Sequence, residues 1–133
     1  MNYFEPHLTP DELRAISAIG LAHMGDAVYE TLVRTWLCVH GKATGKELHR
    51  ATIVLVCAQK QAELAQRVLP QLTEEELAVY KRGRNANVHA MPRSATPAQY
   101  HAATGLECLM GWLYLQGNKE RAEQLFHAMM EEE

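Results

Sequence analysis

The chain has 133 residues, of which 47% are hydrophobic and 22% are charged, and its formal net charge is −3. A chain of this length supports one hydrophobic core, so a single domain over residues 1–133 is predicted. The composition is that of a globular domain and excludes a disordered or low-complexity chain. The apolar runs are far shorter than a membrane span and no basic leader precedes Arg14, so a cytoplasmic location without a membrane anchor is expected.

Apolar residues recur at helical spacing along the chain, and no segment alternates as a strand would, so an all-α fold is predicted. A short helix over residues 11–18 comes first and can run directly into a long one that begins near residue 16 and ends at the turn over 41–45. A single helix is expected over 46–68, stopping at Pro70. The remaining predicted helices cover residues 74–85, 97–115 and 119–130.

Capping residues mark the starts of two of these helices. Thr73 with Glu76 has the spacing of a capping box, and Thr96 followed by Pro97 is typical of an N-cap and a first helical residue. The segment 87–95 contains a proline and has no helical period, so a loop is predicted there.

The cysteines and histidines show no pattern of a disulfide framework or a zinc site. Cys38, Cys57 and Cys108 are odd in number, contain no C-x-x-C pair, and lie in apolar contexts where free cysteine behaves as a small hydrophobic residue. No two histidines have the H-E-x-x-H spacing. Ordinary surface or core roles are predicted for four of them: His7, His23, His40 and His127.

Charge is distributed unevenly along the chain. No Asp or Glu occurs from residue 77 to 106, a segment that contains Lys81, Arg82, Arg84, Arg93, His89 and His101. A second, milder basic stretch over 31–60 has one acid, Glu47, beside Arg34, Lys42, Lys46, Arg50 and Lys60. The net charge alone argues weakly against nucleic acid, but this distribution allows one face to bind a polyanion.

Two apolar helices carry isolated carboxylates. Glu107 is the only acid between residues 94 and 118, on a helical stripe with Tyr100, Thr104, Gly111 and Tyr114. The opposite face, predicted to be core, contains Ala102, Leu106, Leu109 and Leu113. Asp26 and Glu30 are the only acids between residues 15 and 33, and Gly25 before Asp26 lets another backbone or a ligand approach closely.

A buried charge is normally paired or bound to a metal. For either acid alone, a salt bridge or an interhelical hydrogen bond is the simplest interpretation. The pair, with glycines beside both acids and a basic segment elsewhere, instead indicates a hard divalent cation held by oxygens near a phosphate backbone. A metal-dependent phosphodiesterase is therefore predicted, with Glu30 interpreted as an ordinary solvated residue.

Three segments resemble the ribonuclease III family. Residues 21–30 (LAHMGDAVYE) resemble the signature helix of its catalytic domain, residues 104–111 (TGLECLMG) its second acidic motif, and residues 73–86 (TEEELAVYKRGRNA) a segment of its short form, Mini-ribonuclease III. The resemblance implies an all-helical homodimer of ribonuclease III-type domains that cleaves double-stranded RNA with Mg²⁺, without a separate double-stranded-RNA-binding domain. It also implies maturation of large-subunit (23S) ribosomal RNA precursors, with a ribosomal protein that presents the substrate as a further partner.

The chain departs from the longer ribonuclease III pattern at three acidic positions. The two earlier acids of the first motif are replaced by Ile19 and Ala22, and a further acid is replaced by Thr104. Such replacements resemble those of the short form, and they leave the number of bound metal ions open. The resemblance carries over only Asp26 and Glu107 as catalytic, metal-binding acids.

The predicted reaction is in-line hydrolysis that leaves 5′-phosphate and 3′-hydroxyl ends, with Mg²⁺ on the two acids. Contacts to the RNA backbone are expected from the basic block: Lys81, Arg82, Arg84, Asn85 and Arg93. The alternative for these residues is a solvated helix end whose cations complement the helix dipole. The rival function is a non-catalytic RNA-binding or ribosome-associated helical module, in which the acids only stabilise the fold.

Overall fold

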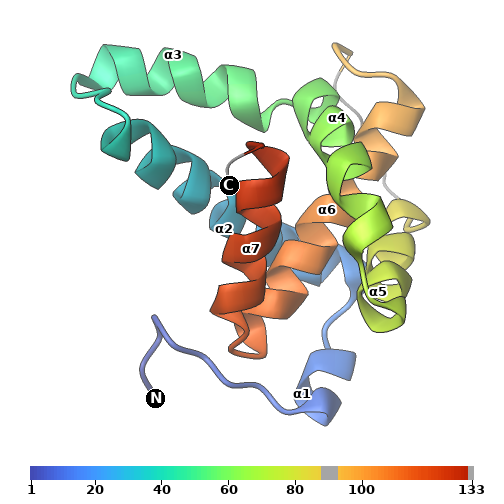
Figure 1. The fold of residues 1–133 in the computed structure, drawn as a ribbon. Helices are drawn as coiled ribbons and strands as arrows, with labels where there is room; N and C mark the ends of the chain where they lie inside the picture. Colours follow the sequence, from blue (N-terminus) through green and yellow to red (C-terminus); the bar gives the residue numbers. More distant parts are fainter. Residues whose placement is uncertain (88–92, 132–133) are drawn as a thin grey trace.

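The structure is a computed structural model that describes residues 1–87 and 93–131, and within this part it contains helices and no strand (Figure 1). The elements in chain order are α1 (Pro10–Arg14), α2 (Ala18–Val39), α3 (Gly45–Val56), α4 (Ala58–Val68), the 3-10 turn η1 (Leu69–Gln71), α5 (Glu74–Arg84), α6 (Pro97–Leu115) and α7 (Lys119–Met129). The all-α prediction is confirmed. Among the described helices, none is both long enough and apolar enough to span a membrane.

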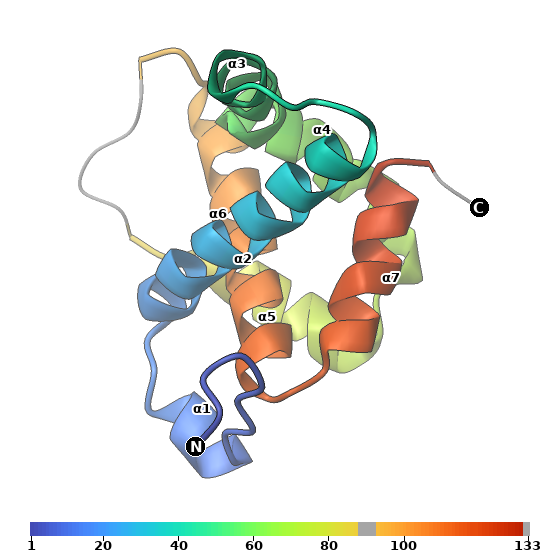
Figure 2. The ribbon, with the colours of Figure 1, turned by 90° about the vertical axis from the view of Figure 1, so that its left-hand side faces the viewer.

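Helix α6 is the centre of the fold. Helices α2, α4, α5 and α7 all pack against it, while α3 packs against α2 and α4. Figure 2 shows α2 running obliquely across α6. The predicted core face of α6 is confirmed, because Ala102, Leu106, Leu109 and Leu113 are all buried. Between residues 102 and 111, Glu107 is the one side chain that is not fully buried.

Local capping signals fix the starts of α5 and α6 where the sequence predicts them. The Thr73 hydroxyl accepts from the Glu76 amide, and the Thr96 hydroxyl accepts from the Gln99 amide, each at 3.1 Å. Glu76 is also bound by Arg121 of α7 through two hydrogen bonds of 2.8 and 2.9 Å. The hydrogen bonds from Arg121 hold the pKa of the buried Glu76 below its usual range, and the pair ties the start of α5 to α7.

The first helical prediction is wrong in its extent. α1 ends at Arg14, and Ser17 begins α2 by accepting a hydrogen bond from the Gly20 amide at 2.9 Å. A serine hydroxyl at an N-cap satisfies a backbone N–H that has no partner inside the helix. The two helices are therefore separate elements.

The single helix predicted over 46–68 is also wrong. Cys57 has an extended conformation (φ −65°, ψ 154°) that separates α3 from α4. Two side chains satisfy carbonyls at the end of α3: the Tyr29 hydroxyl donates to the Leu55 carbonyl at 2.7 Å, and the Gln61 amide donates to the Val56 carbonyl at 2.9 Å. The break turns α4 onto α6 while α3 stays against α2.

The cysteines differ from the predicted apolar setting in two of three cases. Cys108 is buried in α6, and burial raises the pKa of its thiol to about 11. Cys38, in the last turn of α2, and Cys57, between α3 and α4, are exposed. All three are free thiols. The central part of the predicted loop 87–95, with His89, lies outside the described residues.

Candidate active site

Two glycines bring α2 and α6 into backbone contact. A Cβ atom on Gly25 would collide with the Glu107 carbonyl and would lie 2.8 Å from the Gly111 amide nitrogen. A Cβ atom on Gly111 would collide with the Leu21 carbonyl. The close approach predicted at Gly25 is confirmed, and the approaching backbone is α6. Because Asp26 follows Gly25, this contact places it beside Glu107.

The carboxyl groups of Asp26 and Glu107 lie on one cleft where α2 crosses α6. Glu107 is partly buried, whereas Asp26 is exposed, so the expected buried position is wrong for Asp26. Burial, the negative charge of Asp26 and the hydrogen bond with it raise the pKa of Glu107 to about 8. Two carboxyls that resist joint ionisation are stabilised when a cation compensates their charge.

A cleft of about 190 Å³ opens over the pair. Its lining consists of Asp26, Glu107, Ile19, Ala22, His23, Tyr100 and Thr104. The cleft therefore includes all three positions at which the longer ribonuclease III pattern has an acid and this chain has Ile19, Ala22 or Thr104. Over the described residues, no group of three or more His, Cys, Asp or Glu side chains is placed to hold a metal.

Two carboxylates are a sufficient protein ligand set for Mg²⁺. This ion usually keeps several waters and is held by one or two carboxylates together with substrate phosphates. Among the described residues, the lining of the cleft contains both carboxyl groups and no Lys or Arg that would compensate their charge. Asp26 and Glu107 therefore fit a divalent cation, and the rest of its coordination would be left to water and substrate.

Two neighbours of Asp26 on α2 differ in their position relative to the cleft. Glu30 forms an ion pair with Arg34 at 2.6 Å and does not line the cleft, which agrees with its interpretation as an ordinary helix residue. His23 lines the cleft, so its predicted ordinary role overlooked its position. Its spacing of three residues from Asp26, on the same helical face, is the signal that could have shown this.

Sequence reasoning missed Gln61. This side chain of α4 is 2% exposed, and its amide nitrogen donates to the Glu107 carboxylate at 3.3 Å. The sequence contains no local signal for this contact, because the two residues are 46 positions apart and lie on different helices.

Comparison with known proteins decides the family. Residues 20–118 match the ribonuclease III domain. The chain belongs to the ribonuclease III family. It is 45% identical to Mini-ribonuclease 3 of Symbiobacterium thermophilum, over 81% of this chain and 83% of the relative. It is 42% identical to Mini-ribonuclease 3 of Enterococcus faecalis, over 87% of this chain and 89% of the relative.

A solved structure agrees with this assignment. The crystal structure of a protein from Fusobacterium nucleatum superimposes with a TM-score of 0.81 at 27% identity, covering 89% of this chain and 94% of that one. The resemblance inferred from the three segments is thus confirmed. Family membership places the chain among the ribonuclease III-type endoribonucleases.

The basic segment lies at the C-terminal end of α5, beside the helix that carries Glu107. A Cβ atom on Gly83 would lie 2.9 Å from the Gly105 Cα and from the Thr104 carbonyl, so α5 touches α6 at a residue of the cleft. Lys81, Arg82 and Arg84 are exposed in the last turn, Asn85 is the C-cap, and Arg93 is exposed beyond the undescribed residues.

The structure separates Arg82 from Arg84. Arg82 lines a groove with Arg14 and Trp112, whereas the Arg84 guanidinium lies 5.9 Å from the centre of the Tyr80 ring. Residues two apart on a helix do not face the same way, so the two cations flank Gly83. Arg82 and Arg84 therefore do not converge on one point.

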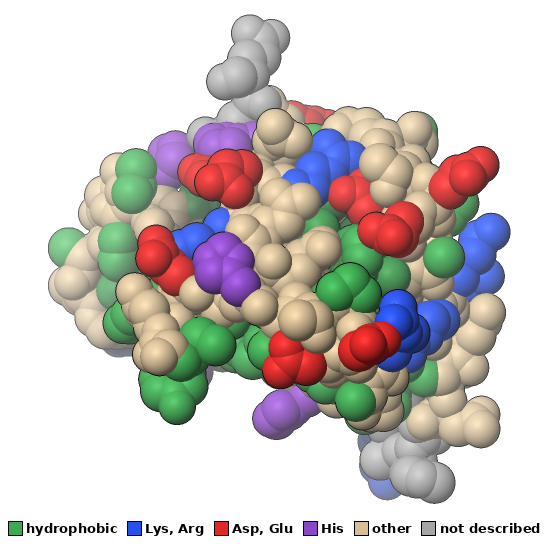
Figure 3. Space-filling model, turned by 90° about the horizontal axis from the view of Figure 1, so that it is seen from below, with side chains coloured by type: hydrophobic (Ala, Val, Ile, Leu, Met, Phe, Trp, Pro, Cys, Tyr) green, Lys and Arg blue, Asp and Glu red, His purple; other side chains and the backbone are tan. Residues whose placement is uncertain are grey.

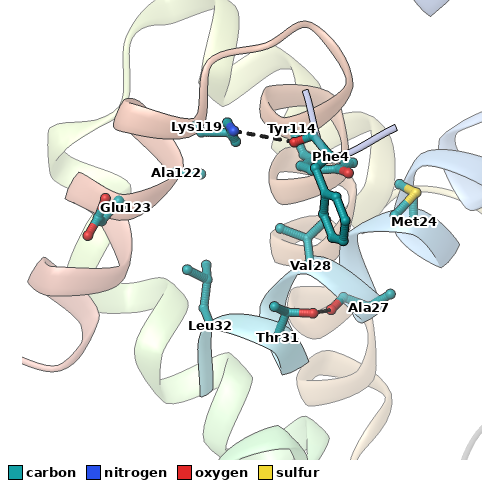
Figure 4. Close-up of a pocket in the computed structure, with 10 residues that line it drawn as sticks. All are labelled: Phe4, Met24, Ala27, Val28, Thr31, Leu32, Tyr114, Lys119, Ala122 and Glu123. Atoms are coloured by element: carbon teal, nitrogen blue, oxygen red, sulfur yellow. Dashed lines mark hydrogen bonds between the residues drawn. The ribbon is translucent and has the colours of Figure 1, made fainter. Parts of the chain in front are cut away.

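A larger pocket of about 370 Å³ lies elsewhere, between α2, α6, α7 and the N-terminal segment (Figure 4). Its wall is apolar apart from Thr31, Lys119, Glu123 and the Tyr114 hydroxyl, and Lys119 donates to the Phe4 carbonyl at 3.3 Å. Figure 4 shows the Phe4 ring directed towards Val28. With a single carboxylate, this pocket lacks the paired acids of the α2–α6 crossing.

Proposed function

We propose that this chain is a Mg²⁺-dependent endoribonuclease that cleaves double-stranded RNA, with Asp26 and Glu107 as its catalytic, metal-binding acids. The observation that carries the proposal is the carboxyl pair held at the glycine contact between α2 and α6. The proximity of the two carboxyl groups and the partial burial of Glu107 disfavour the doubly ionised state, so binding of one cation by both groups would be strongly favoured.

The role of the two carboxylates in the reaction would be to hold the metal ion and to orient it. When bound, Mg²⁺ supplies a water of lowered pKa, polarises the scissile phosphate and stabilises the leaving 3′ oxygen. The ion would be held from two helices, by the exposed Asp26 of α2 and the partly buried Glu107 of α6. The close backbone contact at Gly25 and Gly111 sets the distance between the two helices. Hydrolysis of this type leaves 5′-phosphate and 3′-hydroxyl ends.

Incubation of the protein with end-labelled duplex RNA in Mg²⁺ tests the proposal. We expect cleavage in Mg²⁺, none in excess EDTA, and recovery when Mg²⁺ is added back, because the charge that compensates the carboxyl pair is supplied by the metal. Gel analysis of product lengths measures the outcome. Binding of the duplex without cleavage in Mg²⁺ would instead favour the non-catalytic RNA-binding module.

We propose that the RNA backbone is contacted by the basic end of α5: Lys81, Arg82, Arg84 and Asn85, with Arg93. Support comes from the exposure of these side chains beside the helix that forms the cleft. By contrast, the face seen from below mixes acidic and basic side chains (Figure 3), which does not favour a polyanion there.

Replacing Arg82 and Arg84 together by Ala is expected to weaken duplex binding and to reduce its salt dependence. Each lost phosphate contact lowers the slope of log K against log salt by about 0.9 for a B-form DNA duplex, and we expect a similar change for RNA. Fluorescence anisotropy over a salt series, in EDTA so that no cleavage occurs, provides the measurement.

The matched control is the double variant Arg67→Ala with Lys119→Ala, which removes the same charge outside both basic stretches and outside the groove that Arg82 lines. This control should bind like the wild type. Unchanged affinity and slope in the Arg82/Arg84 variant would make this segment a structural helix end. The RNA surface would then be sought around Lys42, Lys46 and Arg50.

We also propose a homodimer. The strands of a duplex run antiparallel, and a twofold dimer supplies two centres related by the symmetry that relates the strands. A mixed dimer of one wild-type and one Asp26→Asn subunit should nick a single strand of a duplex labelled on both strands. Efficient double-strand cleavage by the isolated mixed dimer, or full activity from a proven monomer, would contradict this arrangement.

The natural substrate is proposed from the resemblance alone. A large-subunit ribosomal RNA precursor stem stays the predicted substrate, and a ribosomal protein that presents it stays a predicted partner. The cytoplasmic location stays a prediction from the sequence pattern.

A further inference from the structure

Gln61 makes two hydrogen bonds with the nitrogen of its side-chain amide. One N–H donates to the Val56 carbonyl at 2.9 Å and the other to the Glu107 Oε2 at 3.3 Å. A primary amide has two N–H donors, so both are used. The side chain is 2% exposed, and within the described structure its Oε1 is buried without a hydrogen-bond donor.

The orientation of this amide is determined by chemistry. The Val56 carbonyl can only accept a hydrogen bond, so the amide nitrogen must face it. Turning the amide over would place its oxygen against the carbonyl oxygen and would leave Glu107 without its donor. An unsatisfied Oε1 is the consequence of the orientation that serves Glu107 and Val56 together.

The bond to Val56 gives Gln61 a fixed reference point. Val56 is the last residue of α3, where the chain breaks before α4, and its carbonyl is held by a side chain. Tyr29 holds the neighbouring Leu55 carbonyl in the same way at 2.7 Å. Anchored there, the Gln61 amide restricts the rotation of the Glu107 carboxylate by holding one of its oxygens.

We propose that Gln61 is a positioning residue, which fixes the Glu107 carboxylate in the orientation that binds the metal with Asp26. This inference rests on the proposed function and deepens it. Groups that hydrogen-bond to metal ligands orient them, and losing such a group typically costs about 10- to 100-fold in metal affinity or activity.

The test compares Gln61→Met with two controls. Methionine keeps the length and packing of glutamine and removes both donors. Tyr29→Phe removes the hydrogen bond from the Tyr29 hydroxyl to the Leu55 carbonyl, which is the other side-chain hydrogen bond at the α3–α4 break. It leaves the hydrogen bond between Gln61 and Glu107 in place. Gln66→Met makes the same chemical change at an exposed position of α4.

We expect Gln61→Met to weaken Mg²⁺ binding to the RNA-free protein about tenfold and to lower kcat about 10- to 100-fold, with KM for duplex RNA unchanged. Titration calorimetry with Mg²⁺ and steady-state cleavage measure the two effects. Both controls should stay within about twofold of the wild type. Loss confined to Gln61→Met supports positioning, because a loosened helix break would affect Tyr29→Phe as well.

Two outcomes would overturn the inference: wild-type Mg²⁺ affinity and kcat in Gln61→Met, or equal losses in Tyr29→Phe. If Gln61→Met does not fold, ¹⁵N NMR of the wild type decides. The Gln61 side-chain amide should shift on Mg²⁺ addition while that of Gln66 stays, and an unmoved Gln61 signal rejects the role. If the wild type binds Mg²⁺ but does not cut RNA, the proposed function fails while calorimetry still tests Gln61.

Discussion

Replacing Asp26 by Asn, or Glu107 by Gln, is expected to abolish RNA cleavage while the fold stays intact. Each substitution keeps the shape of the side chain and removes the charge that would hold the metal. Since losing an outer hydrogen-bond partner already costs about 10- to 100-fold, losing a ligand should cost more. Cleavage of duplex RNA at saturating Mg²⁺, with circular dichroism on the same samples, measures both effects.

The Glu107→Gln variant should also be more stable than the wild type in EDTA at alkaline pH. The raised pKa of Glu107, about 8, means that the folded state keeps a proton that the unfolded state loses near the ordinary value of 4.5. Between these two pKa values the folded state binds more protons than the unfolded state, so the stability of the wild type falls as the pH rises. At pH 8.5 we expect a gain of at least about 1.4 kcal/mol, the equivalent of one pKa unit.

Urea unfolding at pH 5 and pH 8.5 measures this gain, which should be smallest at pH 5. Asp26→Asn should act in the same direction, because it removes the charge that helps to raise the pKa of Glu107. Turnover like that of the wild type in either variant would reject the assignment of these acids. Lost helical circular dichroism would show that the acid is structural.

Gly25→Ala is expected to damage both stability and activity. The new Cβ atom would collide with the Glu107 carbonyl and with the Gly111 amide, and both are backbone atoms that cannot rotate away. Overpacking of this kind costs about 1–3 kcal/mol, and occasionally more. Relief requires α2 and α6 to move apart, which would change the separation of Asp26 and Glu107. Urea unfolding and duplex cleavage measure the two effects.

Gly45→Ala is the matched control for this substitution. Gly45 begins α3, and a Cβ atom there would have no neighbour within 4 Å. Alanine favours helix over glycine by roughly 0.5–1 kcal/mol, so this variant should be as stable as the wild type or slightly more stable. If Gly25→Ala were as stable and active as Gly45→Ala, the backbone contact would not be what positions the acids.

The sequence was enough to predict those helix N-termini that are marked by local capping signals. The capping boxes at Thr73 and Thr96 involve residues three positions apart, so the pattern contains the interaction itself. The break at Cys57 could not be predicted, because the groups that satisfy it come from Tyr29 on α2 and Gln61 on α4. The helical spacing of apolar residues continues through this break, and no local sequence signal shows where the helix ends.

The same distinction applies to the site. By itself the sequence determined the all-α class, the ribonuclease III resemblance and the choice of Asp26 and Glu107, because a lone acid on an apolar helix is costly and therefore conspicuous. Only the tertiary structure decided that Gln61 donates a hydrogen bond to Glu107 and that Asp26 is exposed. These properties depend on how separate helices pack, and packing brings together residues whose spacing in the chain carries no trace of the contact.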